Sequence, residues 1–332
     1  MKPVVLILRK PFATSFSIEY LFETIFRELK KSKINADKMV LPYYSNGLKN
    51  RASNILSLLK IKGRIAHVTG DVHYAILGAW FSKRLLTIHD VEFMNRTSGL
   101  AREVYRLFWI KLPVQFAHRV TTISETAKKD ILTYVKTDPS KIKVIYDFVD
   151  DIYQPVPRNF NAHKPSILCV GTKHNKNLPR IIEAVSGIPC ELFIVGKLNA
   201  ELIQLLDKYG VSYCNFQNLP LQSLHQLYLK ADLLAYVSLR EGFGMPIVEA
   251  QRTGLPVITS TTSCMPEIAG SGAIFANPND VYSIRFGIQT IINDANLREQ
   301  IIQNGFENVS RFTKEKTTQE YVNLYQELST IS

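Results

Sequence analysis

The sequence predicts an α/β protein of two Rossmann-like domains that face each other across a cleft, each with a parallel sheet flanked by helices. Short apolar runs that end in glycine or polar residues alternate along the chain with segments of helical period. The alternation occurs in two blocks, separated by a stretch at 147–157 with three aspartates and two prolines. The length of 332 residues suits two domains of ordinary size.

The first block begins with a short buried strand at 4–8. Arg9 and Lys10 follow it, so this run is too short and too basic at its end for the core of a signal peptide. The next segment has apolar residues at helical spacing between 18 and 29, with Ser17 as a plausible N-cap. The runs at 65–70 and 85–90 are further strands that end in polar residues, including His89. Ligands of open α/β sheets gather at the carboxyl ends of strands, where His89 is placed.

The charge of the chain is concentrated in its first half. The net charge is +11, and residues 1–155 hold 25 Lys and Arg against 14 Asp and Glu, whereas residues 156–332 hold 15 of each. One basic half indicates an anionic partner for that half, such as a membrane surface or a phosphorylated acceptor. The segment 49–64 mixes basic and bulky aliphatic residues. It predicts either an amphipathic helix packed on its own sheet, which we favour, or a segment lying on an anionic bilayer.

Composition excludes several other classes of protein. No apolar run approaches the roughly 20 residues that span a bilayer. The four cysteines have no metal-ligand spacing and three of them lie in or beside apolar runs, which is typical of reduced core thiols in a cytoplasmic protein. No GxGxxG follows any strand, which argues against a nicotinamide dehydrogenase. No DxD-type metal site is evident, so we expect no required metal or cofactor.

The second block carries the densest cluster of chemical signals. A buried strand at 233–237 leads into a loop with glycines and then a helix that opens near Pro246 and stops at Gly254. The loop presents backbone N–H groups at a helix N-terminus, where the helix dipole favours an anion. Glu241 and Glu249 bracket these groups and could accept hydrogen bonds from sugar hydroxyls. The pattern suits a sugar nucleotide.

Glu241, seven intervening residues and Glu249, inside EGFGMPIVEA and followed by GLPVI, resemble the donor-site signature of retaining GT-B glycosyltransferases of the glycosyltransferase 4 family. The resemblance implies the GT-B fold, with an acceptor-binding domain over 1–150, a donor-binding domain over 151–315 and a terminal helix over 316–332 that packs back on the first domain. The chain departs from the family in three places. It has no glycine in the loop before the helix at 17, and it has Lys173 in the region where family members commonly have an arginine. At 147–150 it has Asp-Phe-Val-Asp, where family members usually have Asn-Gly-Val-Asp.

The resemblance also implies roles for individual residues. Glu249 would bind the ribose hydroxyls and Glu241 the sugar hydroxyls, while Lys176 would stabilise the departing diphosphate. His89 would face the donor sugar. The remaining donor-binding residues are expected to be Phe243, Gly244 and Met245 through their backbone N–H groups, Lys173 as a second cation, and the loop glycines Gly171 and Gly196. Whether the loop at Ser15–Ser17 touches the donor stays open.

These expectations predict a glycosyltransferase that moves a sugar from a nucleoside-diphosphate sugar to a glycan or lipid-linked acceptor, in surface polysaccharide or glycolipid synthesis. Its place would be the cytoplasm, with attachment to the inner membrane leaflet as a further hypothesis. A nucleotide-sugar epimerase would share the fold and remains an alternative. A nucleic-acid-binding protein is suggested only by the charge, since no known nucleic-acid-binding motif is present.

Overall fold

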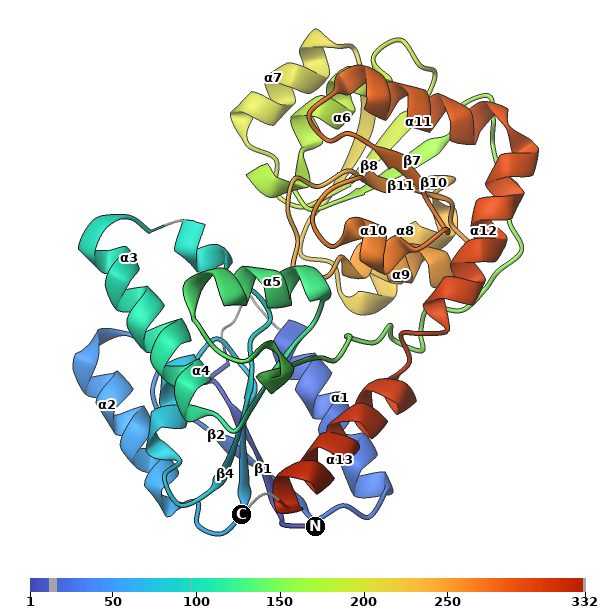
Figure 1. Cartoon of the computed structure of the whole chain (residues 1–332). Coiled ribbons are helices and arrows are strands. Elements are labelled where there is room, and N and C mark those ends of the chain that lie inside the picture. Colours follow the sequence, from blue (N-terminus) through green and yellow to red (C-terminus); the bar gives the residue numbers. More distant parts are fainter. Residues whose placement is uncertain (12–16, 96, 331–332) are drawn as a thin grey trace. The chain divides into compact units, whose positions relative to one another are not determined.

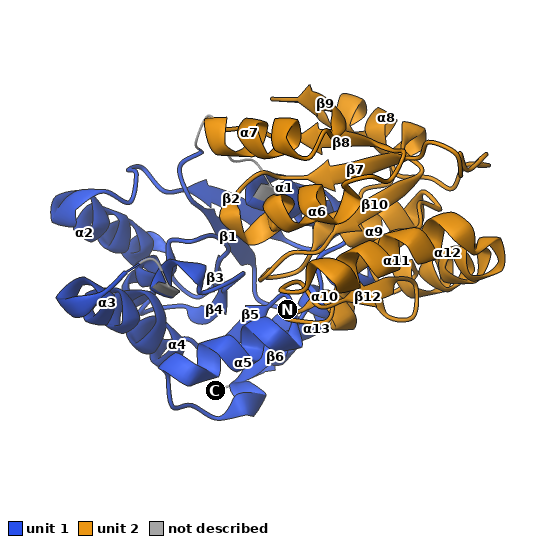
Figure 2. Ribbon diagram, turned by 90° about the horizontal axis from the view of Figure 1, so that it is seen from above, with its two compact units in different colours: residues 1–148, 314–332 blue, residues 149–313 orange. Residues whose placement is uncertain are grey.

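The computed structural model describes residues 1–11, 17–95 and 97–330, and the chain divides into two compact units (Figures 1 and 2). Unit 1 comprises Met1–Phe148 and Lys314–Ser332, and unit 2 comprises Val149–Thr313. The domain boundaries predicted from the sequence, after residues 150 and 315, each lie two residues later than these. The α/β class is confirmed, because each unit holds a six-stranded sheet whose neighbouring strands are all parallel.

The sheet of unit 1 has the strand order β2-β1-β3-β4-β5-β6. Its strands are β1 (Val4–Leu8), β2 (Ala36–Val40), β3 (Ile65–Val68), β4 (Lys83–Thr87), β5 (Arg119–Thr122) and β6 (Ile142–Val144). Its α-helices are α1 (Ser17–Lys31), α2 (Gly47–Ser57), α3 (Gly99–Tyr105), α4 (Leu112–Phe116), α5 (Glu125–Tyr134) and α13 (Lys314–Thr330). Short helical turns are η1 (Leu58–Lys60), η2 (His73–Gly78), η3 (Glu92–Asn95) and η5 (Pro139–Lys141), and η4 (Arg106–Lys111) is a π-helix that joins α3 to α4.

Alternate side chains of the central strands fill two separate cores. Val4 and Leu6 of β1 pack with α1 and α13 on one face of the sheet, and Val5 and Ile7 pack with the helical segments between α2 and α5 on the other. Every residue of β1 is buried, as expected for a parallel strand covered on both sides. Ser17 is the first residue of α1 rather than the residue before it. Ser124 caps α5 by accepting from the Ala127 N–H at 3.0 Å.

The terminal helix α13 is held on unit 1 by a buried polar network. His67 of β3 contacts Tyr325 Oη at 2.8 Å through Nδ1 and Thr87 Oγ1 at 2.7 Å through Nε2. Thr87 in turn contacts Thr121 Oγ1 at 2.7 Å, and the Tyr321 ring lies 5.2 Å from the His67 ring. Buried polar groups that are paired in this way specify one arrangement of the helix on the sheet.

The sheet of unit 2 has the strand order β12-β11-β10-β7-β8-β9. Its strands are β7 (Ser166–Val170), β8 (Glu191–Val195), β9 (Ser212–Phe216), β10 (Leu233–Tyr236), β11 (Val257–Ser260) and β12 (Ile274–Ala276). Its helices are η6 (His174–Lys176), α6 (Leu178–Val185), α7 (Ala200–Lys208), α8 (Leu221–Lys230), α9 (Met245–Arg252), α10 (Met265–Ala269), α11 (Val281–Asn293) and α12 (Ala295–Val309). The apolar core on one face involves α6, α7 and α11, and α8, α9 and α10 lie on the other face (Figure 1).

The strand order of unit 2 reverses between β7 and β10. From β7 the chain proceeds outward through β8 to β9, then returns to the other side of β7 and continues from β10 to β12. Such a reversal opens a crevice at the carboxyl ends of the two central strands, where ligands of open α/β sheets bind. Within the described residues, no helix is long and apolar enough to cross a membrane.

Candidate active site

Loops from three adjacent strands of unit 2 meet at the carboxyl edge of its sheet. β7 and β8 run in register from Ser166 opposite Glu191 to Val170 opposite Val195, which places the following glycines, Gly171 and Gly196, side by side. The loop that follows β10, at 237–244, lies on the other side of β7. The predicted lysine, glutamates and glycines of unit 2 therefore gather around the point where the strand order reverses.

Lys176 and Glu241 form an ion pair across this point. The Lys176 ammonium lies 2.8 Å from Glu241 Oε1 and donates to Tyr236 Oη at 2.7 Å. It also lies 4.7 Å from the centre of the Tyr236 ring, within the range of a cation–π contact. Both charged side chains of the pair are mostly buried, so their attraction is screened less than that of a surface pair.

Two asparagines fix the loop that carries Lys176. Asn177 adopts a left-handed conformation with φ of 58°, and its side-chain amide donates to the carbonyls of Val237 and Pro278. Asn175 donates to the Arg240 carbonyl and to Glu241 Oε1, at 3.1 and 3.2 Å. The loops after β7 and β10 are thus tied together by hydrogen bonds, which orients Lys176 toward Glu241.

Gly171 allows the Lys176 side chain to cross the end of β7. Its φ is +96°, and a Cβ atom there would lie 2.9 Å from Lys176 Cγ. We expect Gly171→Ala to lower the free energy of unfolding of unit 2 by roughly 2 kcal/mol, from backbone strain and the displaced lysine. Gly210→Ala is the matched control, because Gly210 also has a positive φ, +60°, but has no atom within 4 Å of such a Cβ. Equal losses in urea unfolding for the two variants would contradict this account.

Helix α9 begins directly at the site. Gly244 is its N-cap with φ of +103°, and Met245 and Pro246 are its first two residues, so Pro246 is second rather than first. Pro246 has no N–H group and the Ile247 N–H donates to the Gly244 carbonyl at 2.9 Å, so the donors suited to an anion are the N–H groups of Gly244 and Met245 where α9 begins. Phe243 differs from its neighbours, because its side chain is buried against the Phe312 ring with the ring centres 5.5 Å apart, so any contact with a ligand is expected through its backbone.

Glu249 lies one turn into α9 among tyrosines that the sequence did not single out. Its Oε2 accepts from Tyr228 Oη of α8 at 2.5 Å, and the Tyr153 ring packs on the Tyr228 ring with the ring centres 5.3 Å apart. Burial raises the pKa of Glu249 to about 7, and the hydrogen bond from Tyr228 and the Lys176 charge oppose that rise. The Lys176 charge therefore acts on both glutamates of the signature, which brings all three residues into one site.

Tyr236 is a site residue that the sequence analysis missed, because an aromatic residue in a buried strand usually indicates core packing. We expect Tyr236→Phe to lower kcat roughly tenfold, since the lost hydroxyl orients the Lys176 ammonium and a hydrogen bond to a charged group contributes about 1.5 kcal/mol. The KM for the donor should change less than kcat, as measured by steady-state kinetics. Tyr213→Phe on β9 is the matched control and should leave both constants unchanged.

The other predicted residues are placed differently. Lys173 is exposed at the start of η6, and among the described residues it is Lys176 that reaches the ion pair with Glu241. His89 belongs to unit 1 and follows β4. Its Nε2 is buried without a hydrogen-bond partner in the part of the chain described, and burial lowers its pKa to about 3, so the ring is neutral. Ser15 and Phe16 lie outside the described residues.

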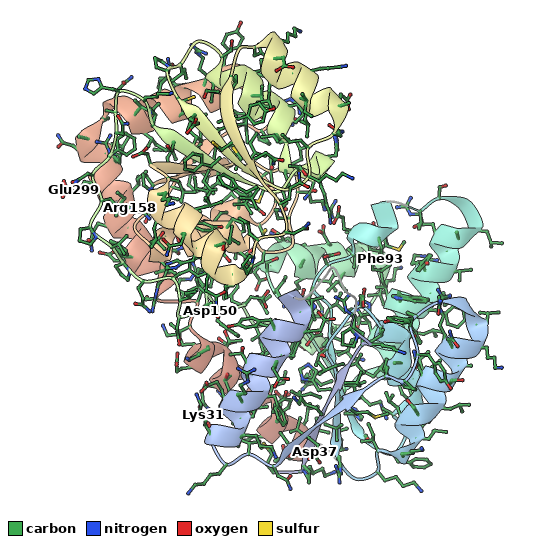
Figure 3. The ribbon with its side chains drawn as sticks, turned by 180° about the vertical axis from the view of Figure 1, so that it is seen from behind. Lys31, Asp37, Phe93, Asp150, Arg158 and Glu299 are labelled. Atoms are coloured by element: carbon green, nitrogen blue, oxygen red, sulfur yellow. The ribbon has the colours of Figure 1, made fainter. Side chains whose placement is uncertain are left out.

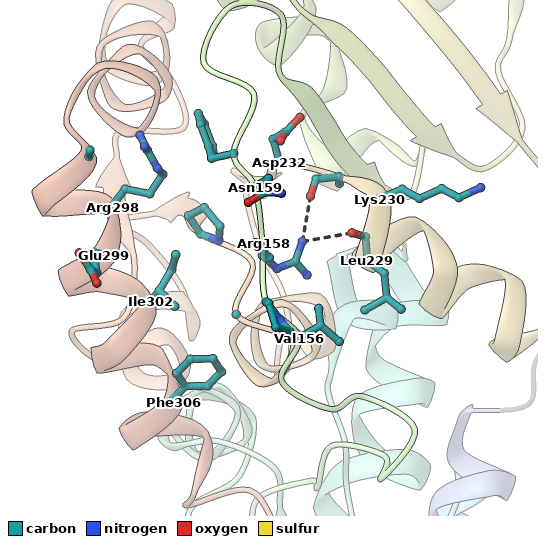
Figure 4. Close-up of a pocket in the computed structure, with 16 residues that line it drawn as sticks. Val156, Arg158, Asn159, Leu229, Lys230, Asp232, Arg298, Glu299, Ile302 and Phe306 are labelled. Atoms are coloured by element: carbon teal, nitrogen blue, oxygen red, sulfur yellow. Dashed lines mark hydrogen bonds between the residues drawn. The ribbon is translucent and has the colours of Figure 1, made fainter.

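A cavity of about 680 Å³ lies in unit 2 at the opposite edge of the sheet (Figure 4). It is lined by residues that precede β10 and β11, by the segment around Arg158, and by the face of α12 that carries Glu299; Figure 3 labels both side chains. Arg158 donates to four backbone carbonyls, those of Tyr228, Leu229, Ala231 and Thr253. The guanidinium N–H groups of Arg158 thus bind backbone carbonyls of neighbouring segments, which indicates a structural role for this residue.

The four cysteines are free thiols, and Cys169, Cys190 and Cys264 are buried, as expected. Burial raises the pKa of the Cys264 thiol to about 12, and its Sγ lies 3.0 Å from the Phe243 carbonyl, so it supports the loop as a neutral donor. Within the described ranges, no group of three or more His, Cys, Asp and Glu side chains is arranged to hold a metal ion.

Residues 154–308 match the family model described as glycosyl transferases group 1. The chain is 31% identical over 219 residues to O-antigen chain mannosyltransferase RfbU of Salmonella typhimurium, covering 62% of this chain and 60% of that protein. It is 27% identical to O-antigen chain mannosyltransferase B of Escherichia coli, covering 80% and 65%. These matches thus span less than two thirds of each relative.

Solved structures resemble the whole chain. HepE of Anabaena in complex with UDP and glucose superimposes with a TM-score of 0.79 at 16% identity, covering 98% of this chain and 100% of that one. Sucrose-phosphate synthase from Thermosynechococcus elongatus gives a TM-score of 0.80 at 17% identity, with complete coverage of both chains. At these identities the likeness concerns the fold. Residues 154–308 of unit 2 therefore resemble glycosyl transferases group 1, and the chain has the GT-B fold that its sequence predicted.

Proposed function

We propose that the chain is a retaining glycosyltransferase that moves a mannosyl residue from a nucleoside-diphosphate mannose to a glycan or lipid-linked acceptor during synthesis of a surface polysaccharide. The family match of unit 2 and the mannosyltransferase activity named for the two relatives support the reaction class and the sugar. The complex of HepE with UDP and glucose supports a nucleotide sugar as the donor. No metal or cofactor is required in this proposal.

The observation that carries the proposal is the meeting of Lys176, Glu241 and the start of α9 at the reversal of strand order. The bond between the anomeric carbon and the β-phosphate oxygen breaks in the reaction, so negative charge develops on the diphosphate. The Lys176 ammonium and the N–H groups of α9 are donors suited to that charge. The carboxyls of Glu241 and Glu249 are acceptors suited to sugar and ribose hydroxyls.

The acceptor oxygen would attack from the face of the leaving group and pass its proton to a phosphate oxygen, so no protein nucleophile is needed. This route retains the anomeric configuration of the donor. Neutral His89, with its unpartnered Nε2, is suited to a hydrogen bond with the donor sugar rather than to a role as a cation.

A panel of GDP-, UDP- and ADP-sugars tests the donor. The correct donor should raise the melting temperature, because a ligand at a hundred times its Kd stabilises the folded state by about 2.7 kcal/mol. We expect a nucleoside-diphosphate mannose to give the largest shift, and the product with a glycan acceptor to be the α-anomer by NMR. Inversion to the β-anomer, or isomerisation of the donor without transfer, would contradict the proposal.

The acceptor side of the proposal is a lipid-linked glycan presented at the anionic cytoplasmic face of a membrane. The excess of basic residues in the first half of the chain supports this part, because Lys and Arg near an anionic bilayer each contribute about 1 kcal/mol to binding.

A further inference from the structure

Two neighbouring helical segments of unit 1 expose apolar stripes. On α2, Leu48, Ala52 and Leu56 follow one another at intervals of four residues, and Leu48 and Leu56 are 83% and 60% exposed. On α3 and η4, the exposed apolar residues are Leu100 (81%), Val104 (43%), Leu107 (38%) and Phe108 (41%). Isolated exposed apolar residues are ordinary, but two stripes of them on adjacent helices mark an interaction surface.

The two segments are neighbours in unit 1. The Arg51 guanidinium of α2 lies 4.7 Å from the centre of the Trp109 ring of η4, and the Trp109 ring lies 4.9 Å from that of Tyr105 in α3. Both views show α2 and α3 on the same side of unit 1 (Figures 1 and 2). The opposite faces of these segments already fill the core, with Asn54, Trp109 and Ile110 buried. The exposed stripes are therefore not needed for packing within unit 1.

The surroundings of the stripes are basic. Residues 47–64 contain five Lys and Arg and no carboxylate, and residues 99–111 contain three and one carboxylate. That carboxylate, Glu103, is paired with Arg106 at 2.6 Å. Lys60, Lys49 and Arg102 are exposed on or beside the stripes. Apolar stripes flanked by lysine and arginine are typical of helices that lie at the surface of an anionic bilayer.

We propose that this docking face, made of residues 47–64 and 99–111, seats unit 1 on a membrane of anionic lipids. Its exposed leucines, Leu48, Leu56, Leu100 and Leu107, lie with Val104 and Phe108 in the acyl boundary, and its basic residues lie at the lipid headgroups. A second copy of the chain fits the face less well, because a two-fold contact would set the same basic surface against itself. The inference deepens the proposed function and rests on it for the lipid-linked nature of the acceptor.

Co-sedimentation with vesicles tests the docking face directly on the full chain. We expect binding to vesicles of phosphatidylcholine with 30% phosphatidylglycerol, weakening with salt, and little binding to phosphatidylcholine alone. Leu100→Glu with Phe108→Glu should lower the partition coefficient at least tenfold. Lys49→Glu with Lys60→Glu should lower it by at least about twenty-five-fold, because each basic residue at such a surface contributes a factor of about five and each new carboxylate is repelled by the lipids.

Matched controls distinguish binding through the docking face from nonspecific hydrophobic or electrostatic binding to vesicles. Tyr282 and Phe286 of α11 are 83% and 73% exposed, so Tyr282→Glu with Phe286→Glu changes an equally exposed apolar pair in unit 2. Lys129→Glu with Lys136→Glu makes the same change of charge elsewhere in unit 1. Both control pairs should bind anionic vesicles as the unchanged protein does.

Three results would overturn the inference: equal binding to neutral vesicles, equal losses in the control variants, or a dimer in solution that the docking-face variants convert to monomer. The thermal shift with the nucleotide sugar is measured on the same variants and should be unchanged, which also shows that they fold. Because vesicle binding needs no donor, failure of the docking face and failure of the proposed donor chemistry give different results.

Discussion

Replacing Lys176 by alanine is expected to lower kcat about a hundredfold with the cognate nucleotide sugar. Its ammonium lies beside Glu241 and Tyr236 at the carboxyl edge of unit 2, where the diphosphate charge would develop. Losing a preorganised donor to such a charge raises the barrier by about 3 kcal/mol. Steady-state kinetics with a saturating acceptor measure the effect, and kcat should fall more than the donor KM rises.

Lys173→Ala is the control for this prediction. It removes the same charge from the same loop, but its side chain is exposed at the start of η6. We expect a loss of less than about fivefold, because solvent and salt screen a charge at the surface strongly. Equal losses in the two variants would indicate that the loop contributes a general positive field, and an unchanged kcat in Lys176→Ala would exclude the assigned role.

Acidification is expected to destabilise unit 1 through buried histidines. Burial lowers the pKa of His67 and of His89 to about 3, whereas an unfolded histidine titrates near 6.5. Below pH 6.5 the unfolded chain therefore binds protons that the folded unit does not. Stability is lost as the pH falls from about 6.5 toward 3, and each histidine accounts for roughly 2 to 3 kcal/mol between pH 6.5 and pH 4.5.

Urea unfolding followed by tryptophan fluorescence measures this loss in unit 1, since Trp80 and Trp109 are the two tryptophans of the chain and both lie there. Asp147 acts in the opposite sense, because burial raises its pKa to about 7 and its contribution is lost as the pH rises. Comparison of the unchanged protein with His67→Gln cancels the contribution of Asp147, because both proteins contain that residue. The variant should be less stable at pH 7 but should lose about 2 kcal/mol less on acidification. Identical pH profiles would contradict the assignment to His67.

The sequence predicted the elements of unit 2 well where periodic apolar runs end in glycine. The strand before Gly171, the strand before Gly196 and the strand-loop-helix around Gly244 are all present. Such elements combine a buried strand, a positive φ and a helix start, so local signals agree with the tertiary structure. The less regular strands β2, β9 and β12 were not predicted, because polar or exposed residues interrupt them and their pairing depends on neighbours distant in sequence.

The candidate site was only partly visible in the sequence. Glu241, Glu249 and Lys176 belong to a recognisable motif and loop, but the pairing of Lys176 with Glu241 spans 65 positions and follows from the strand order. Tyr236 and Tyr228 give no sequence signal, since their hydroxyls find charged partners only through packing. The same holds for the raised pKa of Glu249, which depends on how deeply α8 and α9 bury it.

The central claim is that the carboxyl edge of unit 2 binds the charged tail and the hydroxyls of an activated sugar together. A crystal structure of the chain with the mannose nucleotide that gives the largest thermal shift tests it most directly. We predict the diphosphate within hydrogen-bond distance of Lys176 Nζ and of the first N–H groups of α9, with sugar or ribose hydroxyls on Glu241 and Glu249. A nucleotide seated instead in the cavity beside Arg158, or bound with these glutamates turned away from it, would contradict the account.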